Sequence, residues 1–270
     1  MDYSIGCVSY KVERFTFPAG EVGVKLSSSE KGHIGEDITL RVSLKSSEDV
    51  MTMLLTVDAL RRQHPKSKIF AKIPYVPYSR QDRVCNIGES LSVAVMANLI
   101  NSCGFSGVEV VDPHSDVAPA LINNCKIVDQ YEVFRGVKSS WRDVFIVAPD
   151  AGAYKKSHKF AEKVGAAGVI TCNKVRELST GKIKGLSCQE DVEGLNLFVL
   201  DDICDGGRTF IEVSNLLRAK CKTIELAVTH GIFSKGVELV ADQFDKVYTT
   251  NSYHGKSDFN WQNIQLINVL

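Results

Sequence analysis

The chain has no excess charge of either sign and no long apolar run. Its 270 residues carry 32 basic and 32 acidic side chains, so the formal net charge is zero. A balanced charge disfavours nucleic acid or a membrane surface as the main partner. No apolar run reaches the roughly 18 residues of a membrane span, and the start lacks the basic-then-apolar order of a signal peptide. We therefore expect a cytoplasmic protein.

Cysteine patterns typical of metal sites or disulfide frameworks are also missing. The eight cysteines are scattered, without a Cys-x-x-Cys pair or a cluster with histidine. Most lie in apolar or strand-like segments, which favours reduced thiols that pack as small hydrophobic side chains. Cys204, inside a glycine-containing loop, is the exception. With 44% hydrophobic residues, the chain can form one large or two medium domains.

What the chain does contain is a conspicuous strand-to-helix junction between Leu197 and Phe210. An apolar run leads to two adjacent aspartates, and a glycine turn precedes a helix-like segment. Such a turn gathers backbone N–H groups and the positive end of a helix dipole, where a phosphate can bind. Two carboxylates beside an anion pocket suit ribose hydroxyls or magnesium. The junction predicts a sugar-phosphate site made of Asp201, Asp202, Asp205, Gly206, Gly207, Arg208 and Thr209.

The first half of the chain alternates strands and helices. Residues 12–26 predict a hairpin around a Pro-Ala-Gly turn. A strand at 38–44, a helix at 49–63 whose N-cap and first-turn acids come from residues 46–49, and a buried strand at 68–76 follow. Strand, helix and strand at this spacing form a parallel unit that binds ligands beyond the carboxyl ends of its strands. Arg80 and Gln81 lie just beyond such an end.

The second half repeats this alternation. It predicts strands at 144–148, 169–171 and 224–230, and a helix ended by Gly165. Residues 172–189 are polar and predict a long loop, and such loops in compact domains tend to be lids. The two halves imply tandem α/β domains, 1–135 and 136–270.

Several segments together resemble the ribose-phosphate pyrophosphokinase family. DDICDGGRT at 201–209 resembles the ribose-phosphate loop of phosphoribosyltransferases and, more closely, that of these pyrophosphokinases. The further matching segments are FPAGE at 17–21, IPYVPYSRQDR at 73–83, DPH at 112–114, PDAG at 149–152, KVR at 174–176 and THGIF at 229–233. The resemblance spans residues 12–265. Relative to the family, the chain is expected to lack an N-terminal strand and helix and the final helix.

The resemblance implies a fold and a reaction. The fold would be two tandem phosphoribosyltransferase-like domains, each a mostly parallel sheet flanked by helices, with the ATP-binding segments in 1–135 and the ribose-phosphate loop and lid in 136–270. The reaction would transfer the β,γ-diphosphate of ATP to the 1-hydroxyl of ribose 5-phosphate, giving phosphoribosyl pyrophosphate (PRPP) and AMP for nucleotide biosynthesis. The implied cofactor is Mg²⁺.

The same resemblance implies the residues that bind ATP. Phe17 would stack on the adenine and Glu21 would accept from its amino group, on a hairpin that reaches into a neighbouring subunit of a homo-oligomer. Arg80 and Gln81 would bind ATP as well. His114 would contact the Mg-ATP complex.

Metal-binding and catalytic residues are implied in the same way. His114 and Asp150 would bind the metal, and Asp150 would face the diphosphate. Lys174 and Arg176, in the K-x-R pattern of a flexible catalytic loop, would act on the transferring group. His230, in the THGIF turn, is expected to be structural.

Some positions depart from the family pattern. The family usually has a polar residue at Ala19, further basic residues where this chain has 84–89, and often glycine at Ala153. Arg208 replaces a usual glycine and adds a cation suited to several phosphate oxygens.

Three alternatives follow for the function. The departure at Arg208, together with the missing N-terminal strand and helix, makes a larger acceptor such as ADP-ribose, which would feed NAD synthesis, a rival to ribose 5-phosphate. A phosphoribosyltransferase would share the 201–209 loop but has no use for the ATP-binding segments. A non-catalytic regulatory homologue would be expected to lose the loop cations or metal ligands, which this chain keeps.

Overall fold

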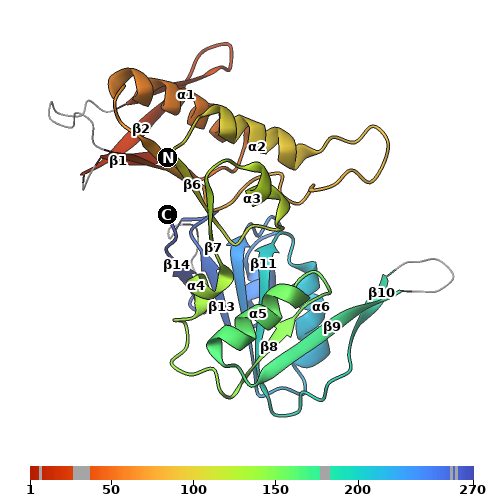
Figure 1. Cartoon of the computed structure of the whole chain (residues 1–270). Helices are drawn as coiled ribbons and strands as arrows, with labels where there is room; N and C mark the ends of the chain where they lie inside the picture. The colour runs from red at the N-terminus through yellow and green to blue at the C-terminus, as the bar shows by residue number, and fades with distance from the viewer. Residues whose placement is uncertain (6–7, 27–36, 177–182, 256–257, 259–260) are drawn as a thin grey trace. The chain divides into compact units, whose positions relative to one another are not determined.

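The computed structural model describes the backbone of residues 1–5, 8–26, 37–176, 183–255, 258 and 261–270. Two compact units make up the chain: Met1–Val128 together with Leu270, and Asp129–Val269. We call them the N-terminal unit and the C-terminal unit. Each contains one seven-stranded sheet (Figure 1).

The sheet of the N-terminal unit is mixed. Its order is β3-β2-β1-β4-β5-β6-β7, and the last four strands run parallel to one another, while β1 is antiparallel to both β2 and β4. The strands are β1 (Asp2–Ile5), β2 (Val8–Thr16), β3 (Val22–Leu26), β4 (Ile38–Arg41), β5 (Ile69–Lys72), β6 (Gly107–Val111) and β7 (Cys125–Val128). The hairpin predicted at 12–26 is therefore present, as β2 and β3.

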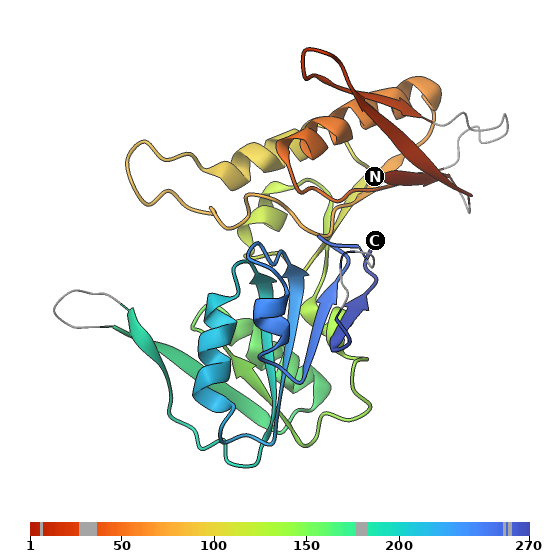
Figure 2. The same ribbon diagram turned by 180° about the vertical axis from the view of Figure 1, so that it is seen from behind.

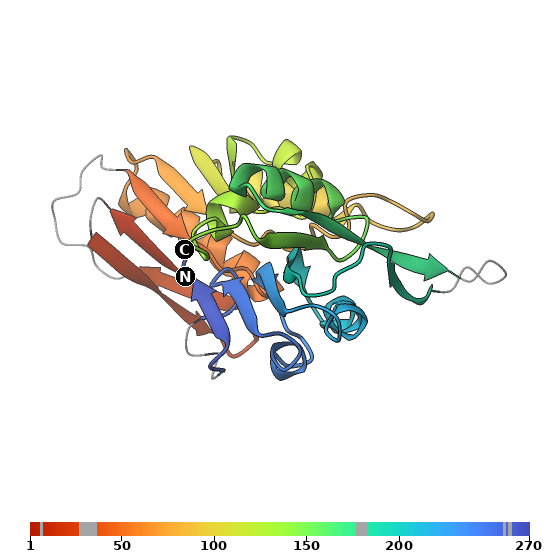
Figure 3. The same ribbon diagram turned by 90° about the horizontal axis from the view of Figure 1, so that it is seen from below.

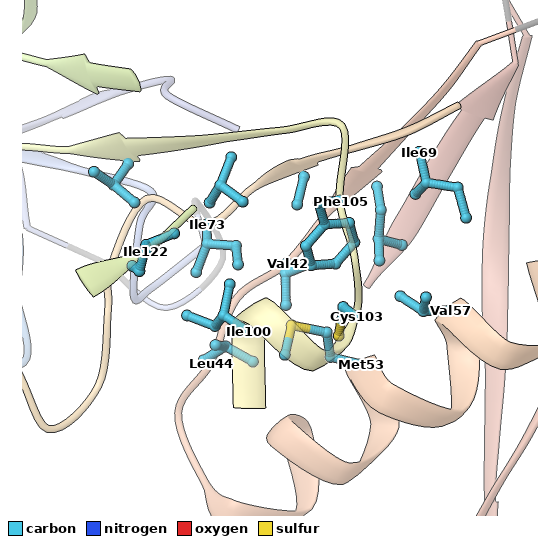
Figure 4. Packing of buried hydrophobic residues seen from close by; sticks show 14 of the residues in the cluster. Val42, Leu44, Met53, Val57, Ile69, Ile73, Ile100, Cys103, Phe105 and Ile122 are labelled. Carbon is cyan, nitrogen blue, oxygen red and sulfur yellow. The ribbon is translucent and has the colours of Figure 1, made fainter. Parts of the chain in front are cut away.

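Helices of the N-terminal unit are α1 (Ser47–Gln63), α2 (Ser92–Ser102) and α3 (Val117–Leu121). The N-cap of α1 is Ser46, within the predicted capping segment 46–49: the Asp49 N–H donates to Ser46 Oγ at 3.2 Å, and the Ser46 N–H donates to Asp49 Oδ2 at 2.9 Å. This reciprocal pair satisfies two N–H groups that a helix start leaves without partners. Met53 and Val57 of α1 then pack with Ile100 of α2 in the buried core (Figure 4).

The sheet of the C-terminal unit is parallel except at one edge. Its order is β10-β9-β8-β11-β12-β13-β14, and only the β9–β10 pair of these described ladders is antiparallel. The strands are β8 (Val144–Ala148), β9 (Gly168–Arg176), β10 (Ile183–Cys188), β11 (Asn196–Cys204), β12 (Thr223–Gly231), β13 (Lys246–Thr250) and β14 (Ile264–Ile267).

Helices cover both faces of this second sheet. They are α4 (Gln130–Phe134), α5 (Tyr154–Val164), α6 (Arg208–Leu217) and α7 (Glu238–Ala241). The α5 helix lies over one face, and α6 and α7 lie over the other (Figures 2 and 3). Trp141 packs edge-on against Phe160 of α5 and Phe198 of β11, with ring centroids 5.2 and 4.9 Å apart. The fold is thus the predicted pair of mostly parallel sheets flanked by helices.

The segment at 172–189 differs from the predicted long loop. β9 pairs with β8 over residues 168–171 and then continues to Arg176, where it pairs with β10 over 172–176. We call the paired residues 172–176 and 183–188 the β9–β10 ribbon. Hydrophobic periodicity misses a strand of this kind, because its sequence is mostly polar and has no regular alternation of apolar and polar residues.

Two predicted strands are shorter than expected. The ladder of β4 ends at Arg41, and that of β5 ends at Lys72, just before Ile73-Pro74. Proline has no N–H to donate to a ladder, which accounts for the early end of β5. Among the described residues, no helix is long and apolar enough to cross a membrane.

The capping pair at the start of α1 predicts the effect of one substitution. Ser46→Ala removes the side-chain acceptor of the Asp49 N–H, which should cost about 1 kcal/mol of local stability. Native-state hydrogen exchange of the α1 amides should therefore quicken about fivefold. Ser47→Ala, one residue further along and outside the capping pair, is the matched control. Unchanged α1 exchange in Ser46→Ala would contradict the role of the cap.

Candidate active site

The glycine turn between β11 and α6 forms the centre of the candidate site. Gly207 is the N-cap of α6 and has φ of +77°, a left-handed conformation that side chains with a Cβ rarely adopt. A Cβ at this position would also lie 2.5 Å from Cγ2 of Val240. The turn therefore requires glycine here, and it brings the unpaired N–H groups of the first turn of α6 to the end of β11.

A second turn, after β12, is bonded to this glycine turn. The carbonyl of Cys204 accepts from the N–H groups of Ile232 and Phe233 at 2.8 and 3.1 Å. Ser234 donates its N–H to the carbonyl of Asp205 at 3.1 Å and its hydroxyl to Asp205 Oδ1 at 2.6 Å. These four bonds fix the two turns side by side at the carboxyl ends of neighbouring strands.

Lys235 follows in the second turn and lies over the first. Its Cδ and Cε would be 3.4 and 3.5 Å from a Cβ at Gly206, so the side chain runs across that glycine. The lysine thereby adds a cation close to the helix end where an anion is favoured.

The two aspartates at the end of β11 have different surroundings. Asp202 is 7% exposed, and its Oδ2 is 3.3 Å from Nζ of Lys156 on α5. Asp201 Oδ1 accepts from the Asp202 N–H at 2.9 Å, and the Asp201 carbonyl accepts from Nε2 of Gln130 at 2.8 Å. Burial, and then the negative charge of Asp202, raise the pKa of the Asp201 carboxyl well above its usual range.

Asp150 adds a third carboxylate near the same sheet edge. It follows β8, which is next to β11, and its Oδ1 accepts from the N–H groups of Gly152 and Ala153 at 2.9 and 3.3 Å. Its charge contributes to the raised pKa of Asp201. A bound cation or a set of hydroxyl donors would reverse that rise, because either favours the ionised carboxylate.

Magnesium fits the chemistry of these groups. It prefers oxygen ligands and usually takes one or two carboxylates together with water and substrate phosphates. Asp150 and the Asp201–Asp202 pair offer such oxygens and a local excess of negative charge. In the part of the chain that the structure describes, no group of three or more His, Cys, Asp or Glu side chains is arranged to hold a metal ion by itself. A site completed by substrate oxygens agrees with both observations.

The expected ATP-binding residues of the N-terminal unit lie at strand ends and at one hairpin turn. Arg80 and His114 are exposed, in the segments that follow β5 and β6. Tyr78 and Asp112, each two residues earlier, have φ of +64° and +40°. Left-handed backbone at residues other than glycine is costly and tends to be kept at functional positions.

Gln81 is held by side-chain and backbone hydrogen bonds. Its side-chain Oε1 accepts from the hydroxyl of Ser92, at the start of α2, and its N–H donates to the carbonyl of Tyr78 at 3.1 Å. Its side-chain amide is thereby oriented by α2.

The hairpin turn between β2 and β3 presents Phe17 and Glu21. The Phe17 N–H donates to the carbonyl of Glu21 at 2.8 Å, and the Phe17 carbonyl accepts from Gly20. Phe17 is 49% exposed and contacts Phe15 edge-on, with ring centroids 5.1 Å apart. An exposed ring on a closed turn is free to stack on a planar group.

Two predicted catalytic residues are placed only by their backbone. Lys174 and Arg176 lie in β9, opposite Leu186 and Ile183 of β10. Their side chains, and residues 177–182 of the predicted lid, lie outside the part that the structure describes. The role of this pair stays a prediction.

Arg208 does not turn its side chain toward the glycine turn. Its Nε donates to Oε1 of Glu212 at 2.7 Å, one helical turn along α6, and the side chain is 84% exposed. Its guanidinium is thus engaged on the helix surface. Nothing in this geometry favours the second phosphate contact that the sequence suggested.

Sequence reasoning missed Lys156, Ser234 and Lys235. A usable signal for the last two was present: β11 and β12 are consecutive parallel strands, so the turns that follow them lie at one sheet edge. Lys156 could be found from its place on the helix that directly follows Asp150. His230 is 2% exposed and its Nδ1 is 2.8 Å from the Ser252 hydroxyl, which agrees with the structural role expected of it.

Comparison with known proteins identifies the class and then the family. The chain has the two-domain, phosphoribosyltransferase-like fold of the crystal structure of phosphoribosylpyrophosphate synthetase from Mycobacterium smegmatis, with a TM-score of 0.83 and 24% identity over 98% of this chain and 88% of that one. Residues 2–104 match the profile described as the N-terminal domain of ribose phosphate pyrophosphokinase. The ribose-phosphate pyrophosphokinase of Aquifex aeolicus is 33% identical over 248 residues, 88% of this chain and 77% of the relative. That of Mycoplasmopsis pulmonis is 30% identical over 250 residues, 90% and 77% of the two chains.

The chain therefore belongs to the ribose-phosphate pyrophosphokinase family, and it is a transferase of the diphosphokinase type. This confirms the resemblance found in the sequence.

The two glycines of the turn predict different costs for the same substitution. Gly207→Ala must place a side chain on a left-handed backbone, which costs about 1–3 kcal/mol. It must also push Val240 away, which costs about 1–3 kcal/mol more. Gly206→Ala meets only the movable methylenes of Lys235 and should cost less than about 0.5 kcal/mol. Urea unfolding of both variants measures the difference. Equal destabilisation would show that the backbone conformation at Gly207 is not the constraint.

Proposed function

We propose that the chain transfers the β,γ-diphosphate of ATP to the 1-hydroxyl of ribose 5-phosphate, giving PRPP and AMP. The observation that carries this proposal is the bonded pair of turns at the ends of β11 and β12, with the aspartate pair beside it. Membership of the ribose-phosphate pyrophosphokinase family supports it.

Residues 201–209 bind the acceptor in this proposal. The N–H groups at the start of α6 hold the 5-phosphate, together with the ammonium of Lys235. Asp201 and Asp202 accept from the ribose hydroxyls, and the ion pair with Lys156 orients the Asp202 carboxylate. Held this way, the 1-hydroxyl attacks the β-phosphorus and AMP leaves.

The N-terminal unit supplies the nucleotide site. Arg80 and Gln81 bind the ATP phosphates and base, and Gln81 is already oriented by Ser92. Phe17 stacks on the adenine and Glu21 accepts from its amino group, both from the hairpin of a neighbouring subunit in a homo-oligomer. His114 of the N-terminal unit and Asp150 of the C-terminal unit would each offer a ligand to Mg²⁺, which would neutralise the polyphosphate charge.

Catalysis then rests on position and charge. Phosphoryl transfer asks for little covalent participation by protein groups, so fixed cations near the transferring group contribute most. Lys174 and Arg176 supply those cations from β9. This strand is next to β8 in the sheet, and Asp150 follows β8. Ribose 5-phosphate is preferred to ADP-ribose as the acceptor, because Arg208 is bound to Glu212.

The direct test is product analysis. Incubation with ATP, Mg²⁺ and ribose 5-phosphate should release AMP and PRPP in equal amounts, and chelation of Mg²⁺ should stop the reaction. ADP-ribose in place of ribose 5-phosphate should give a much lower kcat/KM. Release of ADP rather than AMP, or no product at all from the folded protein, would refute the proposal.

The charge argument predicts the effect of removing one lysine. Lys174→Ala should lower kcat by about 10³ to 10⁵, the range for cations that act on a transferring phosphoryl group, and leave the KM for ATP close to that of the parent. Lys222→Ala removes an exposed lysine of the same unit and serves as the matched control. Near-normal turnover in Lys174→Ala would remove this residue from the mechanism.

A mixing experiment extends this test to the shared adenine site. Glu21→Ala and Lys174→Ala should each be nearly inactive alone. If Glu21 acts in a neighbouring subunit, mixed oligomers of the two variants contain some sites with both residues intact and regain activity. Mixtures that stay inactive after subunit exchange would show that each chain uses its own hairpin.

A further inference from the structure

Two cysteines face each other across the β9–β10 ribbon. Cys172 of β9 is in register with Cys188 of β10, and this pair is the first rung of the ribbon, directly after the Ala148–Thr171 rung that joins β9 to β8. Both cysteines are free thiols. The rung lies two residues before Lys174.

The two thiols differ in access and in bonding. Cys172 is fully buried in the hydrophobic core of the C-terminal unit, whereas Cys188 is partly exposed. The Sγ of Cys188 donates to Glu190, whose Oε2 is 3.4 Å and whose carbonyl is 3.6 Å away. Glu190 Oε1 in turn accepts from the Thr171 N–H at 3.2 Å. A reagent can therefore reach the pair from the Cys188 side.

Directly opposed residues in an antiparallel ladder have the spacing that a disulfide needs. Their Cα atoms are about 4.5–5.5 Å apart, within the range of about 4.4–6.8 Å found in disulfides. We propose that Cys172 and Cys188 are a redox modification site, where a reversible disulfide ties the root of the β9–β10 ribbon and slows the enzyme.

The reaction balances with a small disulfide such as oxidised glutathione. The Cys188 thiolate attacks one sulfur of the reagent, which forms a mixed disulfide and releases one thiolate. The Cys172 thiolate then attacks the Cys188 sulfur, which forms the internal disulfide and releases the second thiolate. The S–S bond of the reagent is broken and one S–S bond of the protein is formed. The two thiol protons of the protein pass to the two small thiols, so the reagent is reduced by two electrons and the protein is oxidised by two.

The environment of the thiols makes this reaction slow at neutral pH. Burial raises the pKa of Cys172 to about 12, with smaller contributions from the nearby Cys188 and Glu190. Burial also raises the pKa of Cys188, with Glu190 and Lys220 as the charged groups that act on it. Because only the thiolate reacts, the rate of closure should rise steeply as the pH increases.

Closure would change the strand that carries Lys174. A disulfide holds the two Cβ atoms about 3.8 Å apart, whereas the Cβ atoms of an ordinary opposed pair are roughly 4.5–5.5 Å apart. The two strands must therefore move closer to each other when the disulfide forms. It also removes the S–H that donates to Glu190. A displacement of about 1 Å near reacting groups can cost about 100-fold in rate. The effect on rate rests on the proposed function, whereas formation of the disulfide does not.

The experiment is oxidation of the whole protein with oxidised glutathione at pH 8.5, followed by alkylation, digestion without reduction and mass spectrometry. We expect a linked peptide pair containing Cys172 and Cys188, loss of two of the eight thiols, and a fall in kcat of roughly tenfold or more. Reduction with dithiothreitol should restore kcat. Hydrogen exchange in β9 and β10 should slow in the oxidised protein.

Three variants make the result specific. Cys188→Ser keeps a donor for Glu190 but should give neither the linked peptide nor the loss of activity, and Cys172→Ala should agree with it. Cys221→Ser, which removes another partly buried thiol of the same unit, should behave as the parent. Absence of the linked peptide in an active enzyme overturns the inference, and so does a linked peptide with unchanged kcat. A reduced protein that makes no PRPP instead refutes the proposed function, whatever the peptide map shows.

Discussion

The left-handed backbone at Gly207 is the constraint on which the candidate site depends. It ends β11, starts α6 and lets Val240 of α7 pack against the turn where any side chain would collide. The bonds from the 232–234 turn to Cys204 and Asp205 then hold this geometry from the neighbouring strand. Every polar group that we assign to the acceptor is positioned by this junction or by a strand next to it.

The same junction concentrates negative charge that a bound ligand would offset. Asp201 is partly buried beside Asp202 and feels the charge of Asp150, and these influences raise its pKa. Lys156 offsets part of this charge through Asp202. A protein that keeps carboxylates in such a position stores unfavourable interaction energy that hydroxyl donors or a cation relieve on binding. The arrangement therefore favours ligands that bring both.

Sequence patterns predicted local features best. The Ser46 cap, the left-handed Gly165 at the end of α5 and the β11–α6 junction depend on residues within one or two turns of each other. The continuation of β9 depended on a partner strand that begins seven residues after β9 ends, and it was missed. The contact of Lys235 with Gly206 joins segments about thirty residues apart, so no local pattern contained it. The sequence could have predicted where the Arg208 side chain points, since Glu212 stands at the i+4 position that pairs with arginine on a helix.

The change of partner along β9 has a consequence for the response of the enzyme to heat. Up to Thr171 the strand is held by β8 inside the sheet, but from Cys172 onward its described ladder runs to β10. A two-stranded ribbon is marginal by itself, and such elements open at lower cost than the body of a domain. The backbone of Lys174 and Arg176 belongs to this ribbon. Thermal inactivation should then precede unfolding of the sheet, with turnover declining on warming while the far-ultraviolet circular dichroism is still that of the native fold.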